Sequence, residues 1–147
     1  MYTYTAIVEK IIDGDTIDLR IDLGFDTWII ERARLTGIDA PETRTKDKKL
    51  EEQGELSLKK LQDLIKPNQE IFIRTEYDRF GRFNRVSASL YLSSLARDNN
   101  ESVNEWMVKN NYAIQYIEKD STKQRNKKHY ENRKILVERG ELSDKVL

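Results

Sequence analysis

The stretch DGDTIDLRIDLGFDTWIIERARL, residues 13–35, decides the fold class that this chain can adopt. Every second residue in its middle part is apolar: Ile17, Leu19, Ile21 and Leu23. This period of two is the pattern of a strand with one buried face. Turn signals bound that strand, DGDT at 13–16 and GFD at 24–26, and a second apolar run follows at 27–35. The stretch therefore predicts two neighbouring strands joined by a short turn.

Three more strands are expected, one before this pair and two after it. Segments rich in β-branched and aromatic residues lie at 4–12, 70–77 and 85–92. The order of three strands, a helix, two strands and then helices favours an α+β fold that is mainly β. We predict a five-stranded OB-type barrel with three helices. A single domain is expected over 1–147, with its motifs within about 4–118.

The three helices are predicted from periodicity and capping signals. The first covers 48–65, where helical spacing makes a core stripe of Gly54, Leu58, Leu61 and Ile65. Capping boxes start the other two, SVNE at 102–105 and STKQ at 121–124. The last helix, 121–139, is basic and has only a thin apolar face: Tyr130, the Lys134 stem and Val137. A basic run is most often a solvated helix face, but this one could also contact substrate.

Composition excludes several classes of site and of protein. The chain has no cysteine, so disulfides and thiolate metal sites are ruled out. With His129 as its one histidine, a histidine-based zinc site or a Ser-His-Asp triad is not expected, and a metal here would be a hard, oxygen-ligated ion. No apolar run is long enough to predict a membrane span. A monomer is expected, because the sequence shows no large apolar patch. The N-terminus lacks a signal-peptide pattern, which predicts a cytoplasmic protein, or a secreted one if a signal has been removed.

Charged residues gather in three turns, at 13–16, 34–42 and 77–82. Each has an ordinary structural interpretation, since Asp-Gly pairs form hairpins and acids stabilise helix starts. Together, however, they supply the parts that phosphodiester hydrolysis needs: a cation, a base and donors for the phosphoryl oxygens. The candidates for these roles are Asp15 and Asp39 for a hard ion, Glu42 for the water, and Arg34 and Arg82 for phosphate. Pro41 stiffens the loop so that Asp39 and Glu42 point in different directions.

The same residues carry a resemblance to the staphylococcal (micrococcal) nuclease, or thermonuclease, family. Four segments match in the family's order: IIDGDTIDL at 11–19, RLTGIDAPET at 34–43, DRFGR at 78–82 and SVNEWMVKNNYA at 102–113. The resemblance implies an OB-type barrel with helices and a calcium-dependent nuclease. It implies cleavage of DNA and RNA at the bond between phosphorus and the 5′ oxygen, leaving 3′-phosphates, with single strands preferred.

The resemblance also implies roles for individual residues around the calcium ion. Asp15 and Asp39 match the calcium-binding carboxylates, and Ala40 matches a residue that binds calcium through its backbone carbonyl. Asp13 would support the metal site from a distance, and Thr16 could help to hold the turn.

The catalytic roles follow from the same motifs. Glu42 matches the residue proposed as general base for water, and Arg34 and Arg82 match the two phosphate-binding arginines. Arg82 would be the arginine that assists the leaving group.

The substrate-binding positions depart from the best-known pattern of the family. Phe80 stands where a tyrosine is usual, so a hydroxyl that could reach a terminal phosphate is lost. A second family tyrosine lies near the base, and here Tyr112 or Tyr116 could serve, because the alignment is ambiguous by one residue. The polar insertion RDNNES at 97–102 predicts an exposed loop.

Two other functions remain open on the sequence alone. One is a non-catalytic nuclease-like module that binds single-stranded nucleic acid, although such modules typically lose one or more of the five catalytic positions. The other is an OB-type carbohydrate or protein binder. Binding that weakens steeply with salt would indicate phosphate recognition and argue against the carbohydrate or protein binder.

Overall fold

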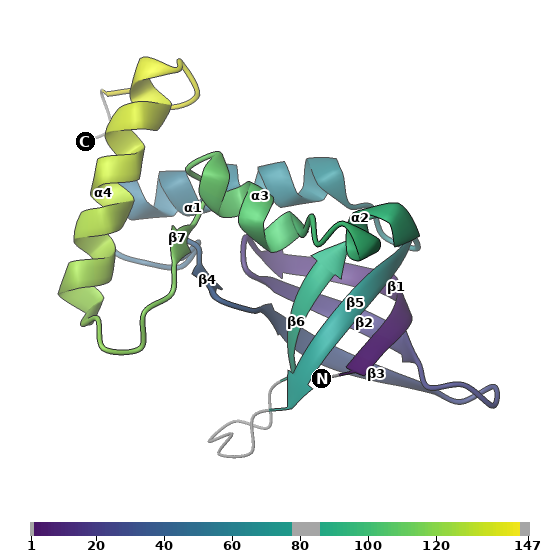
Figure 1. Cartoon of the computed structure of the whole chain (residues 1–147). Coiled ribbons are helices and arrows are strands. Elements are labelled where there is room, and N and C mark those ends of the chain that lie inside the picture. The colour runs from purple at the N-terminus through teal and green to yellow at the C-terminus, as the bar shows by residue number, and fades with distance from the viewer. Residues whose placement is uncertain (1, 78–85, 145–147) are drawn as a thin grey trace.

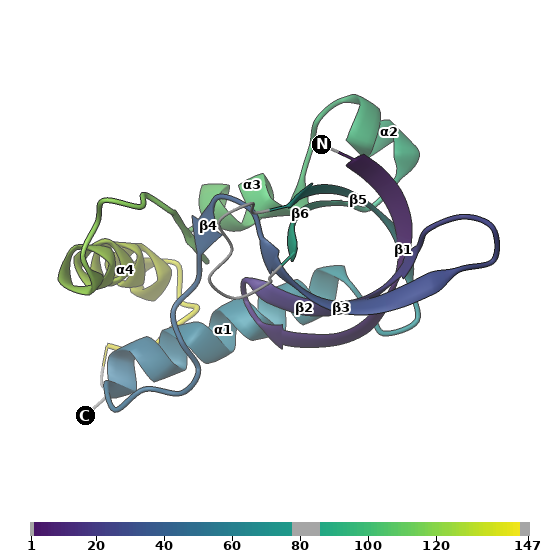
Figure 2. The same cartoon turned by 90° about the horizontal axis from the view of Figure 1, so that it is seen from below.

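The computed structural model describes residues 2–77 and 86–144 of the chain. Within these residues, five strands form a closed barrel with helices along one side and one end (Figure 1). Seen from below, the strands enclose a round core, while α1 and α4 lie outside it (Figure 2). The predicted α+β class and the OB-type barrel are therefore confirmed.

The barrel strands follow the order β1-β2-β3-β6-β5. They are β1 (Tyr2–Asp13), β2 (Thr16–Asp22), β3 (Trp28–Leu35), β5 (Glu70–Tyr77) and β6 (Val86–Tyr91). Neighbours pair antiparallel except β3 and β6, which are parallel and close the barrel. Each of these strands therefore has a neighbour on both sides, although β3 and β6 pair only over Ala33–Leu35 of β3.

The period-two pattern of the sequence fills the barrel. Ile17, Leu19 and Ile21 are at most 2% exposed, and Ala33 and Leu35 on β3 are buried beside them. Burying each large aliphatic side chain contributes roughly 1.5–3 kcal/mol relative to exposure. The alternation that predicted β2 and β3 therefore also fixes which faces of these strands are free to carry charge.

A two-stranded sheet outside the barrel pairs β4 (Ile38–Asp39) with β7 (Ile114–Gln115). Neither strand was predicted, because two residues are too short for a periodic signal. The pairing sets Asp39 opposite Ile114, and the backbone N–H of Tyr116 donates to the carbonyl of Gly37 at 2.8 Å. This small sheet brings the loop after β3 next to the segment that leads into the last helix.

The three predicted helices are all present, and the first two are α1 and α3; the Asp47 cap of α1 was not predicted. Helix α1 (Lys48–Leu64) starts at Asp47, whose side chain accepts from two backbone N–H groups, and α3 (Val103–Lys109) starts at Ser102. A fourth helix, α2 (Ser94–Asp98), was not predicted and makes the expected number of three wrong. Its five residues are too few to show helical periodicity, and the Ser93 cap was the only local signal.

The last helix, α4 (Thr122–Glu138), begins with the predicted capping box between Ser121 and Gln124. Its predicted apolar face is wrong. The residues that α4 buries are His129, Arg133 and Leu136, at the spacing i, i+4, i+7. The two polar side chains are buried because α1 and other segments supply hydrogen-bond partners, which hydropathy along one helix cannot reveal.

Polar contacts dock α4 against α1 and the C-terminal segment. The Arg133 guanidinium donates to the carbonyls of Lys49 and Ser143 and to the carboxylate of Glu52, at 2.8–3.1 Å. The Gln53 side chain, 1% exposed, donates to the carbonyl of His129 at 2.7 Å. Nothing in the sequence indicated how α4 docks. None of the helices among residues 2–77 and 86–144 is long and apolar enough to span a membrane.

Candidate active site

The DGDT turn between β1 and β2 carries a carboxylate that is almost fully buried. Asp15 is 8% exposed; one of its oxygens accepts from the backbone N–H of Ala40 and the other from the Thr16 hydroxyl, both at 2.9 Å. Burial raises the pKa of Asp15, and the Ala40 hydrogen bond and the positive charge of Arg34 only partly offset this. Burial makes the ionised form of this carboxylate costly, and a nearby positive charge stabilises that form.

Arg34, near the end of β3, lies between the two predicted metal-binding carboxylates. Its Nη2 atom is 3.5 Å from Asp15 Oδ2 and 3.3 Å from Asp39 Oδ1. Strand pairing explains the first contact, because Thr16 and Arg34 are register partners of β2 and β3. Two carboxylates 24 residues apart in the chain therefore share one positive charge.

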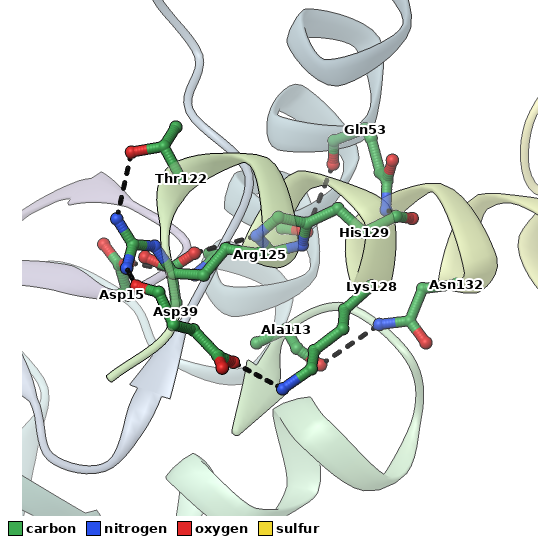
Figure 3. Close-up of polar contacts among 12 residues, drawn as sticks. Asp15, Asp39, Gln53, Ala113, Thr122, Arg125, Lys128, His129 and Asn132 are labelled. Atoms are coloured by element: carbon green, nitrogen blue, oxygen red, sulfur yellow. Dashed lines mark hydrogen bonds and ion pairs between the residues drawn. The ribbon is translucent and has the colours of Figure 1, made fainter. Parts of the chain in front are cut away.

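Asp39 has a second partner that the sequence did not suggest. Its Oδ2 atom is 2.8 Å from Nε2 of His129, a side chain of α4 that is 2% exposed (Figure 3). Burial pushes the pKa of Asp39 upward, but the His129 hydrogen bond and nearby positive charge, Arg34 included, outweigh it and leave the pKa below its ordinary value. The pKa values of Asp15 and Asp39 are thus shifted in opposite directions.

Glu42 lies on the exposed side of the same loop, where solvent can reach it. Two contacts fix the loop. The Thr43 hydroxyl donates to Asp13 at 2.7 Å, and Gly54 of α1 lets the backbone of Pro41 and Glu42 approach so closely that a Cβ on Gly54 would lie 2.5–2.6 Å from their carbonyl oxygens. Asp13 therefore supports the Glu42 loop rather than the turn that contains it.

A second glycine brings the turn before β2 against the same helix. A Cβ on Gly14 would lie 2.8 Å from the Cβ of Ser57 and 3.0 Å from that of Ala40. The Ser57 hydroxyl in turn donates to the carbonyls of Gln53 and Tyr112. Helix α1 is thus the platform on which both acidic turns rest.

The two tyrosine candidates for substrate contact occupy different environments. Tyr116 is 42% exposed, and the guanidinium carbons of Arg34 and Arg125 lie 5.7 and 5.8 Å from its ring centre. Tyr112 is 6% exposed, and its hydroxyl donates to Glu141 at 2.5 Å. The structure brings Tyr116 to the site and leaves little of the Tyr112 ring open to a ligand.

Helix α4 contributes two side chains that the sequence analysis missed as site residues, Arg125 and His129. Arg125 donates to the Thr122 hydroxyl (Figure 3) and to the carbonyl of Asp120 at 2.6 Å. These bonds hold it beside Tyr116. Lys128, on the basic helix that could either be solvated or contact substrate, pairs with Asp120 at 2.5 Å. The available signal was the i, i+4 spacing of Arg125 and His129, but spacing alone did not show that this face meets Asp39.

The chemistry of the donor set fits a hard cation. Asp15 Oδ2 and Asp39 Oδ1 already face the same positively charged atom of Arg34, so both can face one positive charge. In the part of the chain that the structure describes, no three His, Cys, Asp or Glu side chains gather as a metal site. Calcium, which takes six to eight oxygen ligands, would need backbone carbonyl and water oxygens besides Asp15 and Asp39.

Two of the predicted residues, Phe80 and Arg82, lie outside the described residues. The other predicted site residues fall into three groups. Five lie together around the two carboxylates: Asp15, Thr16, Arg34, Asp39 and Ala40. Asp13, Glu42 and Tyr116 lie on the segments that border them, whereas the Tyr112 ring packs 5.6 Å from that of Trp106.

Comparisons with known proteins show which family the chain resembles. The model of a family described as staphylococcal nuclease homologue matches residues 32–136. Among curated proteins, the chain is similar to the endonuclease YhcR of Bacillus subtilis (strain 168), with 30% identity over 119 residues. That alignment covers 78% of this chain but only 9% of the relative, so the chain corresponds to a small part of that protein.

Proposed function

The chain belongs to the staphylococcal nuclease homologue family, and we propose that it is a calcium-dependent nuclease acting on DNA, RNA or both. The observation that carries this proposal is the convergence of Asp15 and Asp39 on one side chain, Arg34. Two carboxylates suited to a hard cation thereby adjoin a guanidinium suited to phosphate. An endonuclease among the similar proteins supports the same reaction class.

The substrate phosphate would be held beside these carboxylates. When bound between Asp15 and Asp39, with the Ala40 carbonyl as a further ligand, calcium would neutralise phosphate charge. Arg34 would then donate to a phosphoryl oxygen through its planar fork, instead of to the two carboxylates. Arg82 is proposed as the second phosphate-binding arginine on the strength of its motif.

Glu42 is proposed as the general base, since it is exposed on a loop whose position Thr43 and Gly54 fix. It would accept a proton from the attacking water while the water oxygen bonds to phosphorus. The bond between phosphorus and the 5′ oxygen then breaks, the 5′ oxygen takes up a proton, and the 3′ side keeps the phosphate. General-base assistance of this kind is typically worth about 10²–10⁴-fold in rate.

Tyr116 is proposed to stack on a base next to the cleaved bond. Its ring is partly exposed and is flanked by two arginines, a combination that favours a nucleobase with its phosphate. Stacking requires a base that is not paired in a duplex, which supports a preference for single strands.

The proposal is tested by cleavage of an end-labelled single-stranded oligonucleotide with calcium and with excess chelator. Wild-type protein should degrade it only with calcium, and Glu42→Gln should be slower by about 10²–10⁴-fold. Glu55→Gln, an exposed glutamate of α1, is the matched control and should cleave at the wild-type rate.

Binding measurements separate the proposal from a non-catalytic module. Calcium should raise the melting temperature of wild-type protein, because it binds the folded state and relieves repulsion between the acids. Tight binding of the oligonucleotide by folded protein without cleavage at any calcium concentration would overturn the proposal in favour of a binding module.

A further inference from the structure

The one histidine of the chain lies in the interior of the candidate active site, on a helix that the catalytic motifs do not include. His129 is 2% exposed and sits one turn after Arg125 on α4. Its Nε2 atom lies 2.8 Å from Oδ2 of Asp39. A carboxylate oxygen accepts hydrogen bonds only, so Nε2 must carry the hydrogen and donate it.

The contact with Asp39 is the sole polar anchor of the imidazole within the described residues. The other ring nitrogen, Nδ1, is buried there without a hydrogen-bond partner. Burying a polar nitrogen without a hydrogen-bond partner destabilises the fold, and an apolar side chain of similar size would avoid that cost. The bond to Asp39 is therefore the feature of His129 that an apolar residue could not supply.

The backbone of His129 is held as firmly as its side chain. Gln53 of α1 donates to its carbonyl at 2.7 Å, and Gln53 is itself 1% exposed. The ring consequently approaches Asp39 from a helix that is anchored to the same α1 platform as the loop of Glu42. A rigid donor is what fixes the rotamer of a carboxylate.

The two oxygens of Asp39 have different partners as a result. Oδ2 faces His129, and Oδ1 faces Arg34 Nη2, the atom that also approaches Asp15. Partners of this kind around a ligating carboxylate orient it, and their loss typically costs 10–100-fold in metal affinity or activity.

We propose that His129 is a positioning residue for calcium: it occupies Asp39 Oδ2 so that Oδ1 stays directed at the cation shared with Asp15. The proposal rests on the calcium site of the proposed function. It extends the active site to α4 and assigns to a buried histidine a task that acts through Asp39, not through contact with substrate.

The first experiment uses wild-type protein and calcium alone. Because the chain has one histidine, ring nitrogen and ring proton signals in an NMR spectrum come from His129 without ambiguity. Calorimetric titration measures whether calcium binds. Absence of binding would defeat the calcium part of the proposed function. Binding that leaves the ring signals unchanged would overturn only the role of His129, and a shift of those signals at saturation is the expected result.

Two variants then test whether an N–H directed at Asp39 is what matters at position 129. Gln at 129 can place an N–H at the position of Nε2, whereas Asn places its N–H at the position of Nδ1, away from Asp39. His129→Gln should keep calcium affinity within a few-fold of wild type, and His129→Asn should weaken it by about 10–100-fold. Equal affinity in both variants would contradict the proposal.

Arg133→Met is the control for a purely structural effect. Arg133 is the next buried polar residue of α4 and holds the same helix to Lys49, Glu52 and Ser143 without a contact to Asp39. This variant should lower the melting temperature in chelator but leave calcium affinity unchanged. A loss of calcium affinity as large as that of His129→Asn would show that docking of α4 alone is responsible.

Discussion

The candidate active site has two halves that differ in how they are built. We call Asp13, Asp15, Thr16 and Arg34, from the β1–β2 turn and β3, the barrel half. Asp39, Tyr116, Arg125 and His129, from β4, the segment after β7 and α4, form the helical half. In the barrel half, contacts arise from strand pairing, as between Thr16 and Arg34. In the helical half, Asp39 and His129 meet across 90 positions of the chain.

The electrostatics of the two halves also differ. Burial raises the pKa of Asp15 in the barrel half, whereas in the helical half His129 and nearby positive charge overcome burial and lower the pKa of Asp39. The ionised form of Asp15 is therefore disfavoured by its surroundings, whereas the ionised form of Asp39 is stabilised by its partners. Among the described residues of the barrel half, Arg34 is the only side chain that contacts both carboxylates.

Among changes within the two halves, the largest effect is expected where the halves meet, at Arg34. Arg34→Gln removes the donor proposed for phosphate and should slow cleavage by about 10²–10³-fold, as loss of one transition-state donor typically does. Initial rates on the labelled oligonucleotide, with saturating calcium, measure this.

The control for Arg34 lies two residues away on the same strand. Arg32 is exposed and pairs with Asp18 at 2.8 Å, so Arg32→Gln should cleave within about twofold of wild type, as expected for a surface ion pair. Similar losses in both variants would mean that general positive charge, not the position of Arg34, matters.

Next in size is the platform under both halves. Gly54→Ala should destabilise the fold by about 1–3 kcal/mol, because the added Cβ meets the Pro41 and Glu42 carbonyls. It should also slow cleavage by roughly 10²-fold if the Glu42 loop moves by about 1 Å. Chemical denaturation and initial rates check the two effects. At an unconstrained helix position the same change stabilises by about 0.5–1 kcal/mol, so a more stable Gly54→Ala protein would refute the packing argument.

The opposite pKa shifts predict opposite stability effects in the absence of calcium. In the folded state the pKa of Asp15 lies above its ordinary value of 3.8, so ionised Asp15 opposes folding at neutral pH. Asp15→Asn should therefore stabilise the protein at neutral pH. Ionised Asp39 favours folding above pH 3.8, and this contribution disappears as pH falls through its lowered pKa; Asp39→Asn should therefore destabilise at neutral pH. Urea unfolding in chelator between pH 3 and pH 7 tests both signs, and both differences should shrink at the acid end.

The smallest effect concerns substrate binding by α4. Arg125 lies against Tyr116, whereas Lys127 is exposed on the same helix. Arg125→Gln should weaken binding of a single-stranded oligonucleotide by a few-fold and reduce the salt slope by about 1. Lys127→Gln serves as its control and should have less effect. If the two variants are equal in fluorescence anisotropy titrations at several salt concentrations, α4 contributes only diffuse charge.

Much of the barrel half could be predicted from the sequence because its determinants are local. Alternating apolar residues at 17–23 state which face of β2 is buried, and the turn chemistry of DGDT places Asp15 at the end of the hairpin. Asp39, Ala40 and Glu42 were also found, because their motif is a short contiguous loop.

The helical half could not be predicted in the same way. The sequence predicts no role for His129, because one histidine makes no zinc site or triad, and it predicts an apolar face of α4 at Tyr130, Lys134 and Val137. In the structure His129 and Arg133 are buried instead, each with partners in segments far away in the chain. Polar residues carry no periodic signal of burial when their partners are non-local.

The sequence by itself determined the barrel, the Ser102 and Ser121 caps of α3 and α4, and the candidate residue types around Asp15. Only the tertiary structure decided that Tyr116 rather than Tyr112 faces the site, that α1 supports both acidic turns, and that α4 brings His129 to Asp39. The physical reason is that strand and cap signals reside in a few adjacent residues, whereas the pairing of β4 with β7 and the docking of α4 on α1 exist only once the chain has folded.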